Sequence, residues 1–207
     1  MVYVAALYTG KKVVTGACHG DAFSRLSIKE QDGELHSGFY DSETGEFISD
    51  EQTFYNKELV LIRHAEVFEY DDPGITPFGK DQCCQSGKYL QDNLDLGDFL
   101  FFSSPCRRCV ETSSALGLET GFSINDMLQD KDEKESPHHF LLRVKEILAT
   151  LPEKSLIVSH CNCILHLAQM ACGSEDITTS NFWIGKIPYC SITYIRGRNL
   201  VCVGKQV

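Results

Sequence analysis

From residue 57 onward, short apolar runs alternate with longer segments of helical pattern, and this alternation constrains the fold more than any other feature. The runs at 59–62, 99–102 and 155–158 are typical of strands buried on both faces of a sheet. Helices are expected between the runs, at 76–93, after Pro105, from Ser136-Pro137 and at 161–172. This order predicts an α/β fold with three layers, α/β/α, and a mostly parallel central sheet.

The end and the beginning of the chain differ from this pattern. Runs at 190–195 and 200–203 predict a hairpin that turns at Gly197-Arg198. Residues 1–56 contain short β-like runs separated by turns, which predicts a small antiparallel meander. The expected strands of this meander are at 2–8, 12–15, 23–29, 35–40 and 46–49. We therefore predict two parts: an acidic β extension, residues 1–56, and an α/β domain, residues 57–207.

The net charge of −10 disfavours nucleic acid and anionic membranes as partners. No apolar run approaches the roughly 20 residues that span a bilayer, and the first residues lack the basic region of a signal peptide. These observations predict a cytoplasmic protein. The extension, residues 1–56, could contact a protein partner, form an oligomer contact or cover a sheet edge.

Polar clusters follow the expected strands at Arg63-His64, Ser103-Ser104, the loop 126–135 and Ser159-His160. Because ligands of such sheets bind beyond the carboxyl ends of the strands, we expect these clusters to share one pocket. Arginine binds phosphate through paired, charge-assisted hydrogen bonds. A neutral imidazole can attack phosphorus, and neighbouring positive charge keeps it unprotonated. The residue types therefore indicate phosphoryl transfer.

Four segments resemble motifs of the histidine phosphatase superfamily, also called the phosphoglycerate-mutase-like family. Residues 59–66, with Arg63-His64, resemble the "RHG" signature, and residues 75–82 match "LTxxGxxQ". Residues 103–112 match "SSPxxRxxxT", and residues 156–160 resemble the strand of the second histidine. The four segments occur in the order of the family.

The resemblance implies a role for each matched residue. His64 would be the phosphorylated nucleophile. Arg63 and Arg107 would bind the phosphate, and His160 would donate a further hydrogen bond to it. Arg108, adjacent to Arg107, would then point to solvent. The resemblance implies no metal and no cofactor.

The acid that protonates the leaving oxygen would be Asp130, in the segment that matches the family's "LxE" pattern. Three neighbouring carboxylates compete for this role: Asp132, Glu133 and Glu135. Arg143, on the following helix, is interpreted as a surface residue or a structural ion pair.

Several departures from the family pattern bear on function. Ala65 replaces the usual glycine, Val67 replaces a hydroxyl residue that often contacts phosphate, and Cys161 replaces a glycine. The segment between Thr112 and Pro137 is too short for the lid insertion of sugar-phosphate mutases, so the chain is more similar to the small phosphohistidine phosphatases.

These features predict a metal-independent phosphatase that hydrolyses phosphomonoesters or phosphoramidates through a phosphohistidine on His64. The substrate would be a phosphorylated small molecule or a phosphoprotein. A catalytically weak or inactive phosphatase fold with a binding or regulatory function is the alternative, and a phosphoglycerate mutase is a third hypothesis.

Ten cysteines are present, and we expect most of them to be reduced because the sequence lacks the features of a secreted, disulfide-rich domain. Cys106-x-x-Cys109 could be half of a zinc site. Cys106 and Cys161 could instead be sensitive to oxidation, because a helix N-terminus lowers the pKa of a thiol.

Overall fold

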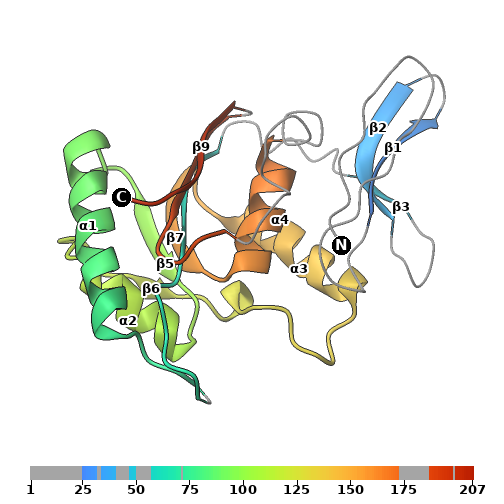
Figure 1. The fold of residues 1–207 in the computed structure, drawn as a ribbon. Coiled ribbons are helices and arrows are strands. Elements are labelled where there is room, and N and C mark those ends of the chain that lie inside the picture. Colours follow the sequence, from blue (N-terminus) through green and yellow to red (C-terminus); the bar gives the residue numbers. More distant parts are fainter. Residues whose placement is uncertain are drawn as a thin grey trace.

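The computed structural model describes residues 25–31, 34–40, 47–49, 57–70, 72–172, 187–197 and 199–207. Its main sheet has the strand order β6-β5-β7-β4-β8-β9. These strands are β4 (Glu58–Arg63), β5 (Leu100–Ser103), β6 (Ser123–Ile124), β7 (Lys154–Ser159), β8 (Ile192–Arg196) and β9 (Asn199–Lys205). The helices are α1 (Pro77–Asn93), α2 (Arg107–Ala115), α3 (Pro137–Thr150) and α4 (Cys161–Cys172), with a short 3-10 turn, η1 (Asp126–Leu128). In Figure 1 the main sheet lies with α1 and α2 on one side and α3 and α4 on the other.

The sheet is mostly parallel, as the sequence predicts. β6, β5, β7 and β4 run in the same direction, whereas β8 and β9 form an antiparallel hairpin at the edge next to β4. In the register of the parallel strands, Arg63 lies beside Ser159, and Ser103 lies beside Val158. The polar residues that end these strands therefore meet at one edge of the sheet.

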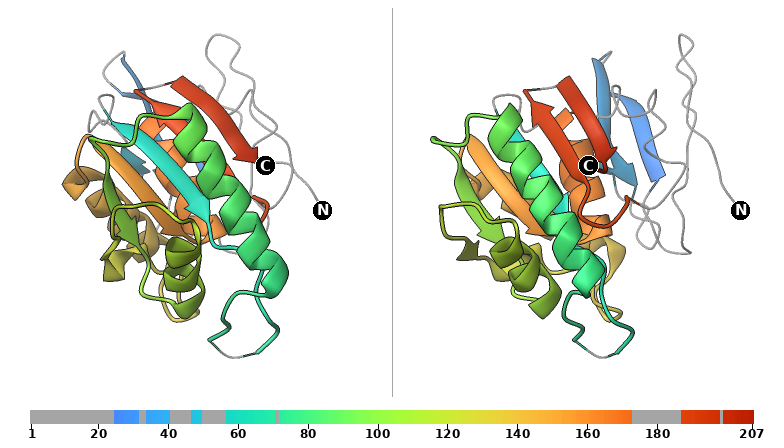
Figure 2. Two further views of the ribbon diagram at one scale, coloured as in Figure 1. Left: turned by 90° about the vertical axis from the view of Figure 1, so that its left-hand side faces the viewer. Right: turned by 60° about the vertical axis from the view of Figure 1, so that its left-hand side comes forward.

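Alternate residues of the central strands build two separate cores, one on each face of the sheet. Leu59, Leu61 and Ile157 pack with the apolar side chains of α3 and α4. Val60 and Leu156 pack on the opposite face with those of α1 and α2. Each fully buried side chain of this size contributes about 1.5–3 kcal/mol. Figure 2 shows α1 lying across its face of the sheet, and the expected three-layer arrangement is confirmed.

Local signals fix the starts of two helices. Thr76 caps α1 by accepting a hydrogen bond from Gly79 N at 2.9 Å, and Ser136 caps α3 in the same way. Within α1, a Cβ on Gly87 would lie 1.8 Å from the oxygen of Leu116, so glycine permits the close contact between α1 and the end of α2. None of the helices in the described part of the chain is long and apolar enough to cross a membrane.

The N-terminal strands form a second sheet. β1 (Arg25–Gln31), β2 (Glu34–Tyr40) and β3 (Phe47–Ser49) pair antiparallel in the order β1-β2-β3, as expected for a meander. The strands expected at 2–8 and 12–15 lie outside the described residues. The division of the chain at residue 57 into two domains stays a prediction.

Candidate active site

Three of the four polar clusters converge at the carboxyl edge of the parallel strands. The backbone N–H of His64 donates to Ser159 O at 2.9 Å, and that of Ser104 donates to Val158 O at 3.0 Å. The rings of His64 and His160 lie with their centroids 5.4 Å apart, edge to face. The topology thus brings together side chains that are almost one hundred residues apart in the sequence.

His64 is a buried, neutral imidazole. Its side chain is 7% exposed, and its Nδ1 lies 2.9 Å from Ala65 O. Because a carbonyl can only accept, Nδ1 carries the proton and Nε2 keeps its lone pair. Burial, followed by the positive charges of Arg63 and Arg108, lowers the pKa of His64 to about 4, although the hydrogen bond to Ala65 opposes this shift. A neutral imidazole with a free Nε2 lone pair has the form that attacks phosphorus.

His160 lies deeper and is bonded through both ring nitrogens. Arg108 Nε and Nη2 lie 3.3 and 3.2 Å from Nδ1, so Nδ1 accepts and Nε2 carries the proton toward Ser104 Oγ at 3.0 Å. Burial, then the charge of Arg108, lowers the pKa of His160 to about 2. A hydrogen bond from His160 to phosphate, as the resemblance implies, would therefore require Nε2 to exchange its protein partner.

Arg63 adjoins His64 on the other side. Its guanidinium lies 3.9 Å from the ring centroid of Tyr189, and Nη1 donates to Ile187 O. The ring of Tyr189 is also 5.5 Å from that of His64. Within the described residues, Arg63 Nε is buried and has no hydrogen-bond partner. An unsatisfied buried donor is costly unless an anion or water binds it, and its position beside His64 suits a phosphate oxygen.

The expectation that Arg107 faces the pocket and Arg108 faces solvent is wrong. The Arg107 side chain is 52% exposed and forms an ion pair with Glu111 at 2.7 Å, one helical turn away. Arg108, the next residue, points to His160 instead. A step of one residue turns the side chain by about 100° around the helix axis, so only one of the two can face the histidines. Arg108 is also the residue that the spacing Ser-Ser-Pro-x-x-Arg selects.

Thr112 joins the two halves of the site, and its contacts were not expected from the sequence. Its hydroxyl accepts a hydrogen bond from Ala65 N at 2.9 Å and donates to Arg108 O at 2.7 Å. The side chain is fully buried, as is Ala65. The segment that follows His64 is therefore bonded to the same helical turn that carries Arg108.

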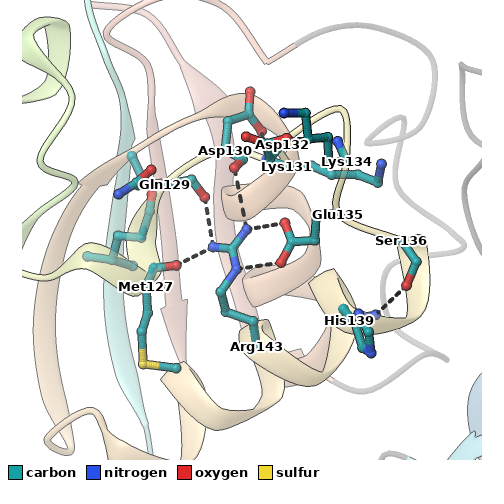
Figure 3. A network of polar contacts seen from close by, with 12 residues as sticks. Met127, Gln129, Asp130, Lys131, Asp132, Lys134, Glu135, Ser136, His139 and Arg143 are labelled. Atoms are coloured by element: carbon teal, nitrogen blue, oxygen red, sulfur yellow. Dashed lines mark hydrogen bonds and ion pairs between the residues drawn. The ribbon is translucent and has the colours of Figure 1, made fainter.

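The fourth polar cluster, the loop 126–135, lies at the end of β7. Ser159 Oγ donates to Leu128 O at 2.7 Å, so the loop is bonded next to His160. Asp130 is half-buried, whereas Asp132 and Glu133 are exposed. Glu135 is held by Arg143 at 2.6 Å, and this contact lowers the pKa of Glu135 (Figure 3). A carboxylate in such a pair keeps its charge, which argues against Glu135 as a proton donor. The choice of Asp130 over Asp132 and Glu133 stays a prediction.

The cysteines whose side chains the structure describes are all free thiols. Cys109 Sγ lies 3.6 Å from His160 Nε2, but burial raises the pKa of this thiol, which makes it unreactive. Cys106 and Cys161 are half-buried at the starts of α2 and α4. Their sensitivity to oxidation stays a prediction.

No protein-family model matches the sequence, and no curated protein matches it. Solved structures do match. A protein described as a mycobacterial hydrolase is 19% identical, with a TM-score of 0.54 over 73% of this chain and 99% of its own. A phosphoserine phosphatase from Entamoeba histolytica, solved with 3-phosphoglyceric acid, is 16% identical, with a TM-score of 0.55 over 72% of this chain and 98% of its own.

A phosphoglycerate mutase from Thermus thermophilus is 17% identical, with a TM-score of 0.53 over 70% of this chain and 97% of its own. The chain has the histidine phosphatase fold. At these identities the likeness concerns the fold. In this chain β4 ends at Arg63, immediately before His64.

Proposed function

We propose that this protein is a metal-independent phosphatase that hydrolyses phosphomonoesters or phosphoramidates through a phosphohistidine on His64. The observation that carries the proposal is the buried, neutral imidazole of His64, which lies 5.4 Å from the ring of His160 and is influenced by the positive charges of Arg63 and Arg108. The arginines offer donors to the phosphate oxygens, where negative charge collects in the transition state.

The reaction has two steps. In the first, His64 Nε2 attacks phosphorus, the bond from phosphorus to the leaving oxygen breaks, and a proton passes from Asp130 to that oxygen. In the second, water attacks the phosphohistidine while the Asp130 carboxylate takes a proton from the water. The bond between phosphorus and nitrogen breaks, phosphate leaves, and the lone pair of His64 is restored.

The substrate would be a phosphorylated small molecule or a phosphoprotein, bound in the cytoplasm. The 24 residues between Thr112 and Pro137 leave little chain for a lid over the pocket. A mutase has to keep its phosphorylated intermediate away from water, which favours hydrolysis over transfer for this chain. The matched phosphoserine phosphatase and phosphoglycerate mutase illustrate both outcomes on this fold.

One observation favours a second function, that of a phosphate-binding regulatory protein. Val67 forms a backbone bridge with Ile75 and packs against the α1–α2 core, so it offers no hydroxyl to a phosphate. Such a protein would bind phosphorylated ligands in the same pocket without turning them over.

Hydrolysis of nitrophenyl phosphate, with and without EDTA, distinguishes the two. We expect turnover by the wild type that EDTA does not abolish, that His64→Ala loses, and that His139→Ala keeps as a matched control on the exposed side of α3. Absence of turnover between about pH 5 and 8, with both nitrophenyl phosphate and a phosphohistidine peptide, would refute the phosphatase and favour the regulatory protein.

A further inference from the structure

Arg143, on the first turns of α3, uses all of its hydrogen-bond donors on one loop. Nε and Nη2 bind the two carboxylate oxygens of Glu135 at 2.8 and 2.6 Å. Nη1 donates to Met127 O and to Gln129 O, the latter at 2.9 Å. Nη2 also donates to Asp130 O at 3.4 Å. A guanidinium has five N–H groups, so none remains for a ligand.

The contacts wrap the segment 127–135, which we call the acidic loop, around one side chain (Figure 3). Arg143 and Glu135 are only 19% and 17% exposed, so solvent screens their attraction weakly. Three of the bonds go to backbone carbonyls on both sides of Leu128. They hold the backbone itself and do not depend on the side chains of the loop. The guanidinium therefore fixes the path of the backbone that carries Asp130.

The acidic loop is also tied to the phosphate pocket. Ser159 Oγ bonds Leu128 O, and His160 follows Ser159 directly. The charge of Arg143 is close enough to contribute, after burial and nearer charges, to the lowered pKa of His160. One end of the loop is thus anchored at the pocket and the rest is anchored on Arg143.

We propose that Arg143 is a positioning residue that holds the acidic loop so that Asp130 can deliver its proton to the leaving oxygen. This inference rests on the proposed phosphatase function. It assigns no contact between Arg143 and the substrate, because the donors of its guanidinium are already used.

A proton donor matters most when the leaving group is a strong base. Nitrophenolate leaves without protonation, whereas phenolate, whose conjugate acid has a pKa of about 10, needs a proton. A residue that only stabilises the fold would slow both substrates equally. A residue that positions the acid changes the ratio of the two rates.

The test compares kcat/KM for phenyl phosphate and nitrophenyl phosphate in Arg143→Lys, which keeps the charge and loses the planar fork. We expect a loss of about 10-fold for phenyl phosphate and of less than about 3-fold for nitrophenyl phosphate, since general acid catalysis contributes about 100-fold or more. The matched control is Arg196→Lys, because Arg196 pairs with Glu58 at the start of β4, at the end of the strand away from His64. It should leave the ratio unchanged.

Asp130→Asn should shift the same ratio, and Arg143→Lys added to it should have no further effect on phenyl phosphate. If Arg143→Lys does not fold, Glu135→Gln loosens the same loop and must reproduce the shift in the ratio. Equal slowing of both substrates in folded Arg143→Lys or Glu135→Gln would overturn the positioning function while leaving the phosphatase intact. A wild type that hydrolyses neither aryl ester nor a phosphohistidine peptide would instead refute the proposed function itself.

Discussion

Replacing Thr112 by valine removes one hydroxyl and keeps the shape of the side chain. In the native structure this hydroxyl accepts the N–H of Ala65 at 2.9 Å, and both residues are fully buried. Valine cannot accept a hydrogen bond, and water does not reach the site. The variant therefore leaves the Ala65 N–H without a partner, next to His64.

The cost follows from the burial of that N–H group. A buried donor that loses its partner costs about 1–3 kcal/mol. With a dependence on urea of about 2 kcal/mol per molar, a loss of about 2 kcal/mol lowers the unfolding midpoint by about 1 M. A domain of ordinary stability, about 5–15 kcal/mol, remains folded without denaturant, so its activity can still be measured.

Urea unfolding of the wild type, Thr112→Val and Thr150→Val measures the effect. Thr150 is an exposed threonine of α3 whose hydroxyl bonds only the preceding turn, and its replacement should change the free energy of unfolding by less than about 0.5 kcal/mol. Thr112→Val should also lower kcat/KM, because the bond joins the segment after His64 to the turn of Arg108. Equal midpoints for the two variants would show that the hydrogen bond between Thr112 and Ala65 does not stabilise the fold.

Further predictions concern charge, pH and packing. Arg108→Ala should lower kcat/KM for nitrophenyl phosphate by about 100-fold, the typical cost of one transition-state donor, and Arg107→Ala by less than about 3-fold; similar losses would contradict the assignment. Burial lowers the pKa of His166 to about 4. Below about pH 6.5 the unfolded chain therefore binds more protons than the folded chain, and the free energy of unfolding decreases as the pH is lowered. Lowering the pH from about 7 to 5 should reduce the free energy of unfolding by about 2 kcal/mol through this histidine. A His166→Gln variant whose free energy of unfolding depends on pH as strongly as that of the wild type would contradict this. Gly87→Ala should cost about 1–3 kcal/mol through its contact with the end of α2. Gly121→Ala, with no described atom within 4 Å of the added Cβ, should cost less, and equal melting temperatures would contradict this.

Most of the fold could be predicted because its signals are local. The apolar run at 59–62 and the Thr76-Pro77 cap each specify an element without reference to the rest of the chain, and both are where the sequence places them. β6, Ser123–Ile124, was not predicted. Its two residues are exposed, and the strand is defined by its pairing with β5. The local sequence carries no signal for that pairing.

The site could be predicted in part. The strand ends brought Arg63, His64 and His160 to one place because the register of parallel strands is set by their buried residues. The choice between Arg107 and Arg108 could have been made from the sequence, because the spacing Ser-Ser-Pro-x-x-Arg falls on Arg108. In the structure, an ion pair with Glu111 holds Arg107 on the surface. The contacts of Arg143 go mainly to backbone oxygens of a loop, so the sequence contains no pattern that would indicate them.

In the proposed reaction, phosphate passes through a nitrogen of His64. The most direct test mixes the protein with an isotopically labelled aryl phosphate, quenches turnover in alkali, in which phosphohistidine is stable, and maps the label on peptides. We expect label on the peptide that contains His64, lost on brief acid treatment and absent in His64→Ala. Turnover with the label on another residue, or turnover that persists in His64→Ala, would contradict it.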